Sequence, residues 1–205
     1  MSRHATRLPQ VMSGTAEPFY HSPMNSPSAA LVFRAATIGD IPALVELVTS
    51  AYRGDSSRQG WTTEADILDG NRIDAEVLRQ DIERPRSRVL IAEREGQWLA
   101  CAHICAQDAG GYFGMFSVRP DRQGSGLGRA VLSEAERIAR DEWKLPVMRM
   151  TVIVQREELI AWYERRGYRR TGEYKPFPYG DERFGIPRRD DLRFEVLVKE
   201  LGACP

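Results

Sequence analysis

The sequence has 205 residues, of which 42% are hydrophobic and 28% charged, the composition of an ordinary globular protein. Its 29 Lys and Arg residues balance its 29 Asp and Glu residues, so bulk charge gives no reason to expect binding to nucleic acid or to a membrane surface. No apolar run approaches the roughly 18 residues that a membrane-spanning helix needs, and the length suits one well-buried domain.

Residues 1–30 are rich in Ser, Pro, Ala and Met and lack the apolar core of a secretory signal. Such a segment cannot bury enough apolar surface to offset its ordering entropy. We therefore expect a flexible tail, unless translation starts at Met24, followed by a single domain at 31–205. The three cysteines follow no disulfide or zinc spacing, which favours a reducing cytoplasm.

Hydrophobic periodicity and turn residues predict the order of the secondary structure. In chain order we expect a strand at 31–34, a helix from Thr37 to about Tyr52, a polar break at 54–63, a short helix at 74–82, a β-hairpin of strands 88–92 and 98–105, a strand at 112–118, a helix from Leu127 to about Glu142, a strand at 147–154, a helix at 157–166 and a last strand at 192–199. Antiparallel strands followed by β-α-β units indicate a mixed sheet packed by helices.

The most informative stretch is 117–128, between a predicted strand and a long predicted helix. A helix N-terminus carries unpaired N–H groups and partial positive charge, which favour a diphosphate, and glycines let the backbone approach such a ligand. A glycine-rich turn without a ligand is an equally good interpretation of this pattern alone. A nucleoside-triphosphate loop fits badly because Gly128 is followed by Arg129, and the dinucleotide fingerprint has a longer last spacing.

The run Gln123-Gly-Ser-Gly-Leu-Gly128 resembles the Gln/Arg-x-x-Gly-x-Gly/Ala signature of the GNAT acetyltransferases. The segment at 115–121 resembles that family's fourth strand and its exit, and 159–168 resembles its Leu-Tyr-x-x-x-Gly-Phe helix end. The resemblance implies an α/β (α+β) GNAT fold. We therefore expect a mixed central sheet of about six to seven strands, splayed between strands four and five, with helices on both faces.

The resemblance also implies that acetyl-CoA is the co-substrate. Main-chain groups of Phe116 and Val118 would pair with the pantetheine arm like an added strand, and the Val118 N–H would polarise the thioester carbonyl. The pyrophosphate would be held by main-chain N–H groups of Gln123, Gly124, Ser125, Gly126, Leu127, Gly128 and Arg129.

Acetylation of an amine requires that an alkylammonium with a pKa of about 10.4 lose a proton and that the departing thiolate gain one. The resemblance puts Tyr163 in the role of general acid, although helical spacing alone makes Tyr163 part of an apolar core face. The general base stays open between Glu64, His103 and water. Glu64 is equally well a helix-start carboxylate.

His103 alternates with Cys101 and Cys105 on one predicted strand. Ligands at alternating positions of a single strand match no common zinc site, so buried packing is the preferred interpretation and no metal is expected. At the start of the helix that carries Tyr163, the family often has an Asn that touches pantetheine. Here the sequence is Gln155-Arg156, so that contact is altered or lost.

The segments expected to form the acceptor pocket, 52–72 and 173–189, carry aromatic residues and charges of both signs. They fit a small-molecule amine or a peptide end, with no single-sign cluster. The leading hypothesis is an N-acetyltransferase that acts as a monomer or homodimer. The alternatives are a non-catalytic acetyl-CoA sensor and an acyltransferase with another acyl group or a hydroxyl acceptor.

Overall fold

The computed structural model describes residues 29–108 and 110–202, so nearly all of the predicted tail lies outside the described residues. Within these ranges a seven-stranded sheet has the order β1-β3-β4-β5-β6-β9-β7. The strands are β1 (Val32–Ala35), β3 (Ser87–Arg94), β4 (Gln97–Gln107), β5 (Gly110–Val118), β6 (Val147–Ile153), β9 (Arg193–Glu200) and β7 (Arg169–Pro176). Neighbouring strands are antiparallel except for β5 and β6, which are parallel, so the predicted mixed sheet is confirmed.

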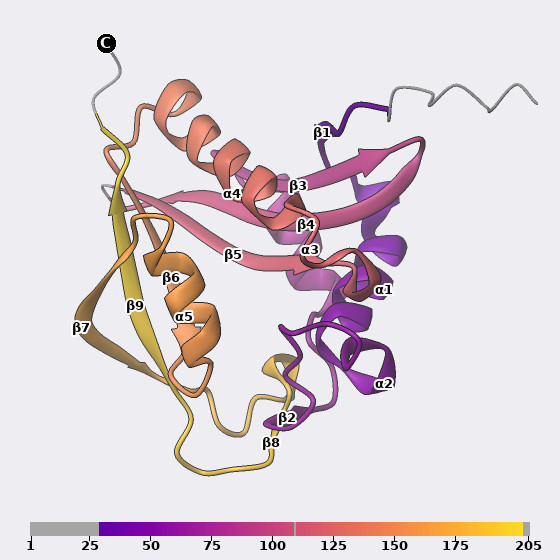
Figure 1. Ribbon diagram of the computed structural model, residues 1–205, viewed down its shortest axis with the longest axis vertical. Helices are drawn as coiled ribbons and strands as arrows, with labels where there is room; N and C mark the ends of the chain where they lie inside the picture. Colours follow the sequence, from indigo (N-terminus) through magenta and orange to yellow (C-terminus); the bar gives the residue numbers. More distant parts are fainter. Residues whose placement is uncertain (1–28, 109, 203–205) are drawn as a thin grey trace, which may run out of the picture.

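Helices cover both faces of this sheet, as predicted (Figure 1). On one face α1 (Ile41–Tyr52) and α3 (Ala75–Glu83) pack against residues such as Val89 and Ile91. On the other face α4 (Leu127–Arg137) and α5 (Glu157–Glu164) pack against residues such as Leu90 and Ala92. Because successive strand residues point to opposite faces, the same strands supply both cores. We call these two sides the α1/α3 face and the α4/α5 face.

Helix boundaries follow local capping signals. The Asp74 side chain accepts hydrogen bonds from the N–H groups of Glu76 and Val77, which begins α3. Thr37 and Asp40 form a capping box, but a single 3₁₀ turn precedes α1, which begins at Ile41. Helix α4 continues in a π-helical turn to Glu142, so the predicted end of this helix is confirmed.

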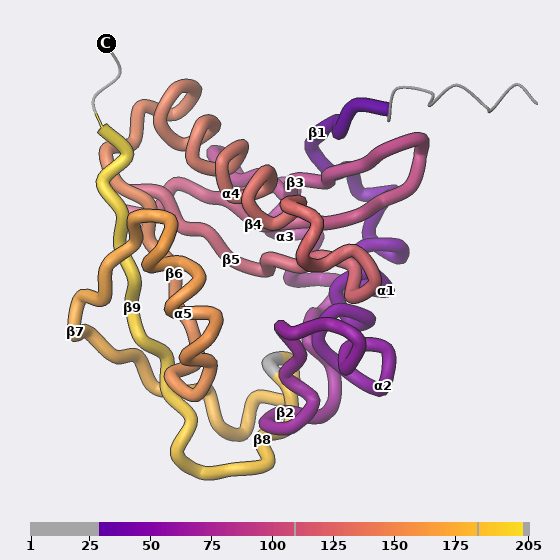
Figure 2. Tube along the Cα trace, viewed as in Figure 1, coloured from indigo at the N-terminus to yellow at the C-terminus, as the bar shows by residue number. Residues whose placement is uncertain are grey.

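Three strands and one short α-helix among the described residues were not predicted. Strand β7 is one, because every residue in it is exposed and its sequence lacks alternating apolar residues. Strands β2 (Leu68–Asp69) and β8 (Ile186–Pro187) pair with each other across the chain, and Figure 2 shows their two loops meeting at one end of the molecule. The polar break contains a short helix, α2 (Gly54–Ser57). None of the helices among the described residues is long and apolar enough to cross a membrane.

Candidate active site

The parallel strands β5 and β6 separate soon after they begin. Their register covers only Gly111 with Met148 and Tyr112 with Arg149, whereas β6 then pairs with β9 along its whole length. At the point of separation the Tyr112 hydroxyl lies 3.2 Å from the Thr151 hydroxyl. The expected splay between the fourth and fifth strands of the family fold is therefore confirmed, counting β5 and β6 as those strands.

The second half of β5 has a free edge that faces this gap. The Arg119 N–H donates to the Leu99 carbonyl on β4 at 2.9 Å. Because successive N–H groups of a strand point to opposite edges, the Val118 N–H points away from β4 and toward the gap. Met115 has a left-handed φ of 47°, and the β4–β5 register shifts beside it, as in a β-bulge. The Phe116 carbonyl is already engaged, because it accepts a hydrogen bond from the Tyr52 hydroxyl.

After β5 the chain turns directly into the N-terminus of α4. Gly124 and Gly126 have φ values of 81° and 85°, and a Cβ atom on either would meet nothing within 4 Å. The backbone of this turn is thus open on the side where side chains would otherwise stand. The first internal hydrogen bond of the helix runs from the Ala130 N–H to the Gly126 carbonyl at 3.1 Å, so the preceding N–H groups have no partner within the helix.

Gln123 acts through its side chain as well as its backbone. Its Oε1 accepts from the Trp61 N–H at 3.0 Å, and its Nε2 donates to the Thr62 hydroxyl at 2.9 Å and to the Val118 carbonyl at 3.2 Å. Its own N–H is directed at the Pro120 carbonyl, 3.4 Å away. The side chain therefore ties the segment before Glu64 to the turn. The family signature contains this Gln but does not reveal the tie.

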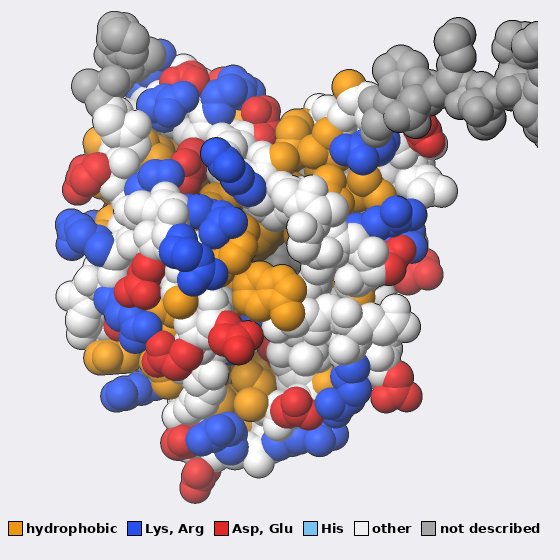
Figure 3. Space-filling model, in the orientation of Figure 1, with side chains coloured by type: hydrophobic (Ala, Val, Ile, Leu, Met, Phe, Trp, Pro, Cys, Tyr) orange, Lys and Arg blue, Asp and Glu red, His pale blue; other side chains and the backbone are white. Residues whose placement is uncertain are grey.

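These features surround one cavity of about 560 Å³, which we call the central cavity. Its wall consists of Tyr52, Trp61, Thr62, Phe116, Val118, Gln123, Gly124, Gly126, Gly128, Arg129, Arg156, Glu158, Leu159, Ala161, Trp162, Tyr163, Arg165 and Arg166. Figure 3 shows hydrophobic side chains at the surface in the middle of one face, with Lys and Arg side chains gathered beside them. The wall thus offers apolar surface and four guanidinium groups, a combination that suits a long ligand with an anionic end.

Tyr163 brings an uncommitted hydroxyl to this cavity from α5. The residue is 4% exposed, and its ring packs edge-on against Trp162 with the centroids 5.1 Å apart. Its hydroxyl forms no hydrogen bond with any residue in the described ranges. Burial raises the pKa of Tyr163 above its ordinary value, so the phenol keeps its proton at neutral pH. Tyr163 is therefore both a core aromatic and a proton donor with no partner.

Residues 43–168 match the family model described as "Acetyltransferase (GNAT) family", which covers more than half of the chain. The chain belongs to the GNAT acetyltransferase family. It is an acyltransferase, and acetyl-CoA is the co-substrate of this family.

One relative by sequence and two solved structures are similar to this chain. The chain is 26% identical over 147 residues to an S-alkylcysteine N-acetyltransferase of Bacillus subtilis, across 67% of this chain and 78% of that protein. Its fold is similar to that of a ribosomal-protein-alanine N-acetyltransferase from Brucella melitensis, with a TM-score of 0.60, 23% identity, and coverage of 82% of this chain and 99% of that one. It is also similar to a putative acetyltransferase from Salmonella typhimurium bound to acetyl-CoA, with a TM-score of 0.61, 19% identity, and coverage of 86% and 98%.

In this GNAT protein the Glu64 carboxylate is buried and forms ion pairs with three arginines. Its Oε2 lies 2.7 Å from Arg53 Nη1 and 3.4 Å from Arg72 Nε, and its Oε1 lies 2.9 Å from Arg156 Nη1. Burial alone would raise the pKa of Glu64, but the three guanidinium groups outweigh it and hold that pKa below its ordinary value. We call these four residues the Glu64 cluster. A carboxylate whose affinity for a proton is lowered in this way is a poor general base.

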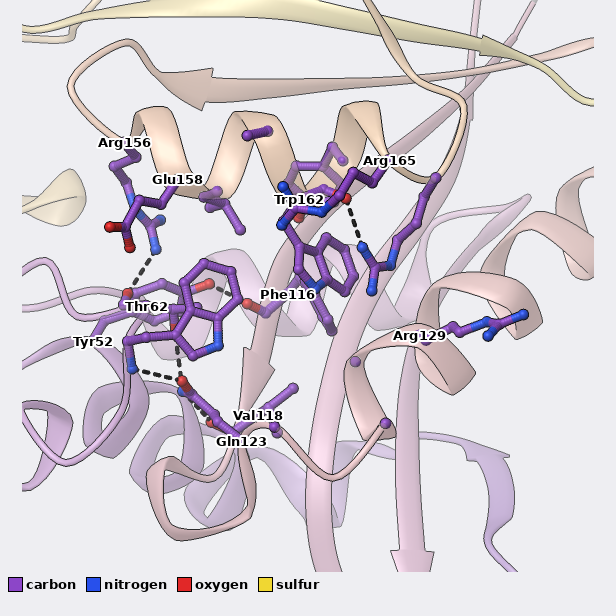
Figure 4. A pocket seen from close by; sticks show the side chains of 18 residues that line it. Tyr52, Thr62, Phe116, Val118, Gln123, Arg129, Arg156, Glu158, Trp162 and Arg165 are labelled. Carbon is purple, nitrogen blue, oxygen red and sulfur yellow. Dashed lines mark hydrogen bonds between the residues drawn. The ribbon is translucent and has the colours of Figure 1, made fainter.

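Arg156 belongs to the pair Gln155-Arg156, in the region where the family resemblance led us to look for an Asn. It lines the central cavity, where its Nη2 donates to the Thr62 carbonyl at 2.6 Å (Figure 4). Its Nη1 binds Glu64. Through these two contacts Arg156 connects the start of α5 to the segment at 61–64. Figure 4 also shows Glu158 on the same turn of α5, an exposed acid in the cavity wall that the sequence reasoning did not single out.

His103 lies away from the central cavity. Its Nε2 is 2.8 Å from the Ser87 hydroxyl and its Nδ1 is 3.5 Å from an Asp81 carboxylate oxygen. Burial lowers the pKa of His103 to about 4 and raises that of Cys101 to about 12, so both groups are neutral at physiological pH. Cys101, His103 and Cys105 all lie buried on β4, in agreement with the packing interpretation. Both candidate bases are therefore poor proton acceptors, Glu64 because three arginines surround it and His103 because burial lowers its pKa and Ser87 binds its ring.

Proposed function

We propose that this protein transfers the acetyl group of acetyl-CoA to a primary amine. The observation that carries the proposal is the convergence of three features in one cavity: the free edge of β5, the N-terminus of α4 and the unpartnered Tyr163 hydroxyl. Acetyl-CoA supplies an activated thioester, an adenosine diphosphate end and an extended pantetheine arm between them. Each of these parts has matching groups in the cavity wall.

Different groups of the cavity wall would bind the pyrophosphate, the pantetheine arm and the thioester of acetyl-CoA. The N–H groups from Gly124 to Arg129 open the helix and would hold the pyrophosphate, with Arg129 and Arg165 adding positive charge. Because the Phe116 carbonyl binds Tyr52 and the Val118 carbonyl binds Gln123, pairing of β5 with the pantetheine arm would use the Phe116 and Val118 N–H groups. The Val118 N–H would donate to the thioester carbonyl, where negative charge develops during attack.

Tyr163 would donate its proton to the thiolate as the carbon–sulfur bond breaks. Its raised pKa guarantees that the proton is present, although it also makes the phenol a weaker acid, so donation would have to accompany bond cleavage. The amine would lose its proton to water. This assignment is supported by the engaged state of Glu64 and by the burial of His103, which lowers its pKa to about 4.

The acceptor would be a small-molecule or peptide amine. Since the Bacillus subtilis relative is an S-alkylcysteine N-acetyltransferase, amino acids with small side chains head the panel of acceptors to be tested. We also propose that the protein is cytoplasmic, on the basis of its unpaired cysteines, and acts as a monomer or homodimer.

The proposed function is tested by thiol release from acetyl-CoA across amines, amino acids and peptides, together with calorimetric binding of acetyl-CoA. We expect binding and turnover. Tyr163→Phe should lower kcat at least tenfold with little change in acetyl-CoA affinity.

The matched control is Tyr168→Phe, which removes a hydroxyl from the same aromatic cluster but from a residue that does not line the central cavity. Unchanged turnover in Tyr163→Phe would remove its assignment as the acid. Stoichiometric binding without turnover on any acceptor would support a non-catalytic sensor instead.

A further inference from the structure

The Glu64 cluster carries more positive than negative charge. Three guanidinium groups surround one carboxylate, and Glu64, Arg53 and Arg156 have side chains that are 3%, 6% and 11% exposed. The nearby acids do not restore neutrality, because Asp66 is paired with Arg58 at 2.9 Å and Asp69 with Arg188 at 2.7 Å. Excess charge in a largely buried place is costly unless an anion joins it.

Arg72 is the member of the cluster that remains available to a ligand. Its Nε faces Glu64 and its guanidinium lies 4.8 Å from the centroid of the Tyr52 ring. Its two terminal amino groups form no hydrogen bond with the residues that the structure describes, and its side chain is 27% exposed. Arg156, by contrast, is committed to Glu64 and Thr62.

Arg53 is not available in the same way. Its Nε and Nη2 are buried without a hydrogen-bond partner, and the backbone before β8 closes over it. A Cβ atom on Gly185 would stand 2.9 Å from Arg53 Nη2. A ligand can therefore reach the cluster through Arg72, while Arg53 adds positive charge behind it.

Arg72 lies near the start of the gap between β5 and β6, because its neighbour Tyr112 is the last residue of β5 that pairs with β6. Its neighbour Tyr52 packs in the core of the α1/α3 face, and Tyr112 points to the same face because the next residue, Phe113, packs in the opposite core. Arg72 is not part of the wall of the central cavity. Tyr112 also lines a hollow of about 540 Å³ with His103, Thr151 and Phe194. Arg72 does not line this hollow, but Tyr112 adjoins both, so an acceptor in the hollow would lie beside Arg72 and beside the place where β5 and β6 separate.

We propose that the acceptor is an amine that bears a carboxylate close to its nitrogen, as in an α-amino acid, and that Arg72 binds this carboxylate. The inference rests on the proposed function and adds the class of acceptor. A guanidinium presents two parallel N–H donors to a carboxylate, and here a second and third cation reinforce the attraction. The same charge repels acceptors that carry an additional ammonium group.

The test compares acceptors that differ only in this carboxylate. Thiol release from acetyl-CoA is measured with S-methylcysteine, methionine and phenylalanine, and with their amides and the corresponding amines that lack the carboxyl group. We expect kcat/KM to be at least tenfold higher for the acids than for either analogue, as the loss of a charged hydrogen-bonded pair implies.

Arg72→Gln should abolish this preference by lowering kcat/KM at least tenfold for the acids alone, and Arg72→Lys should restore part of it. The matched control is Arg58→Gln, an exposed arginine of the same connection that pairs with Asp66. Acetyl-CoA binding and thermal unfolding of each variant show whether it is folded.

Equal turnover of acids and their analogues would overturn the inference while leaving the proposed function intact. A preference for acids that survives in Arg72→Gln would also overturn it. Failure of every acceptor, with acetyl-CoA bound or unbound, would refute the proposed function and the inference with it.

Discussion

Replacing Glu64 by Gln tests whether the Glu64 cluster holds the acceptor segment in place. Gln keeps the size of the side chain and one carbonyl oxygen but removes the charge that three arginines share. Two of those arginines are almost fully buried, with side chains 6% and 11% exposed. Removing one partner of a buried ion pair costs about 3–5 kcal/mol, because the remaining charges stay in a poorly solvated place.

We expect a loss at the lower end of this range, because Arg156 keeps its bond to the Thr62 carbonyl and Arg72 is partly exposed. For a protein of this size each kcal/mol lowers the melting temperature by about 2–4 °C, so Glu64→Gln should melt about 6–12 °C below the natural protein. The measurement is thermal and urea unfolding at pH 7, with Asp66→Asn as control. That variant breaks an exposed pair and should cost less than about 1 kcal/mol.

The pH dependence of the free energy of unfolding supplies a second test of the Glu64 cluster. The pKa of Glu64 is lower in the folded than in the unfolded protein, so its contribution is fully present above the unfolded value of about 4.3 and is lost as pH falls through the lower folded value. The difference between the natural protein and Glu64→Gln should therefore shrink below about pH 4. If Glu64→Gln were no less stable than Asp66→Asn at pH 7, the cluster would not be a buried, coupled unit and this reasoning would be wrong.

Three further predictions concern single positions. A Cβ atom on Gly60 would lie 2.6 Å from Gln123 Nε2, so Gly60→Ala should displace the Gln123 side chain and weaken acetyl-CoA binding several-fold. The double variant Gly60→Ala/Gln123→Ala should bind acetyl-CoA no more weakly than Gln123→Ala alone, and additive losses of affinity would contradict this. Gly128→Leu should weaken acetyl-CoA binding at least tenfold in calorimetry, because a Cβ atom there already stands 3.4 Å from Trp162 at the cavity wall; unchanged binding would exclude this wall as the site. Burial lowers the pKa of His103 from 6.5 to about 4, so its contribution to stability is present above pH 6.5 and is lost as pH falls toward 4. Between pH 6.5 and pH 4, the free energy of unfolding measured in urea should fall by about 3 kcal/mol less in His103→Asn than in the natural protein. Parallel plots of that free energy against pH for the two proteins would refute the assignment.

The sequence predicted the parts of the fold that local chemistry determines. The strand, Gly-rich turn and helix at 112–137 form as expected because apolar periodicity and positive-φ glycines act within a few residues of one another. Strand β7 could not be found in this way, since all of its residues are exposed and only its pairing with β9 defines it. The pairing of β2 with β8 likewise depends on residues more than a hundred positions apart.

The candidate site likewise has features that the local sequence predicts and features that arise only from long-range contacts. The family signature identified Gln123 and Tyr163, but not that the Gln123 side chain binds the segment at 61–62. The segments 52–72 and 173–189 showed charges of both signs with no visible excess. The excess arises only in three dimensions, where Arg156, which comes from neither segment, joins Arg53 and Arg72 around one carboxylate. No spacing rule connects these positions, so a single sequence could not have revealed the cluster.

The segment at 61–64 is held from both sides of the central cavity. Gln123, on the turn between β5 and α4, binds the Trp61 N–H and the Thr62 hydroxyl, while Arg156, at the start of α5, binds the Thr62 carbonyl and Glu64. A ligand on the Gly-rich turn would hold Gln123 in place. A ligand on Arg72 would hold Glu64 in place, and Glu64 also binds Arg156. Because both ligands would then order the same few residues, binding of acetyl-CoA should lower the entropic cost of binding the acceptor. Arg156 would therefore connect the two proposed ligand sites through its contacts with Thr62 and Glu64.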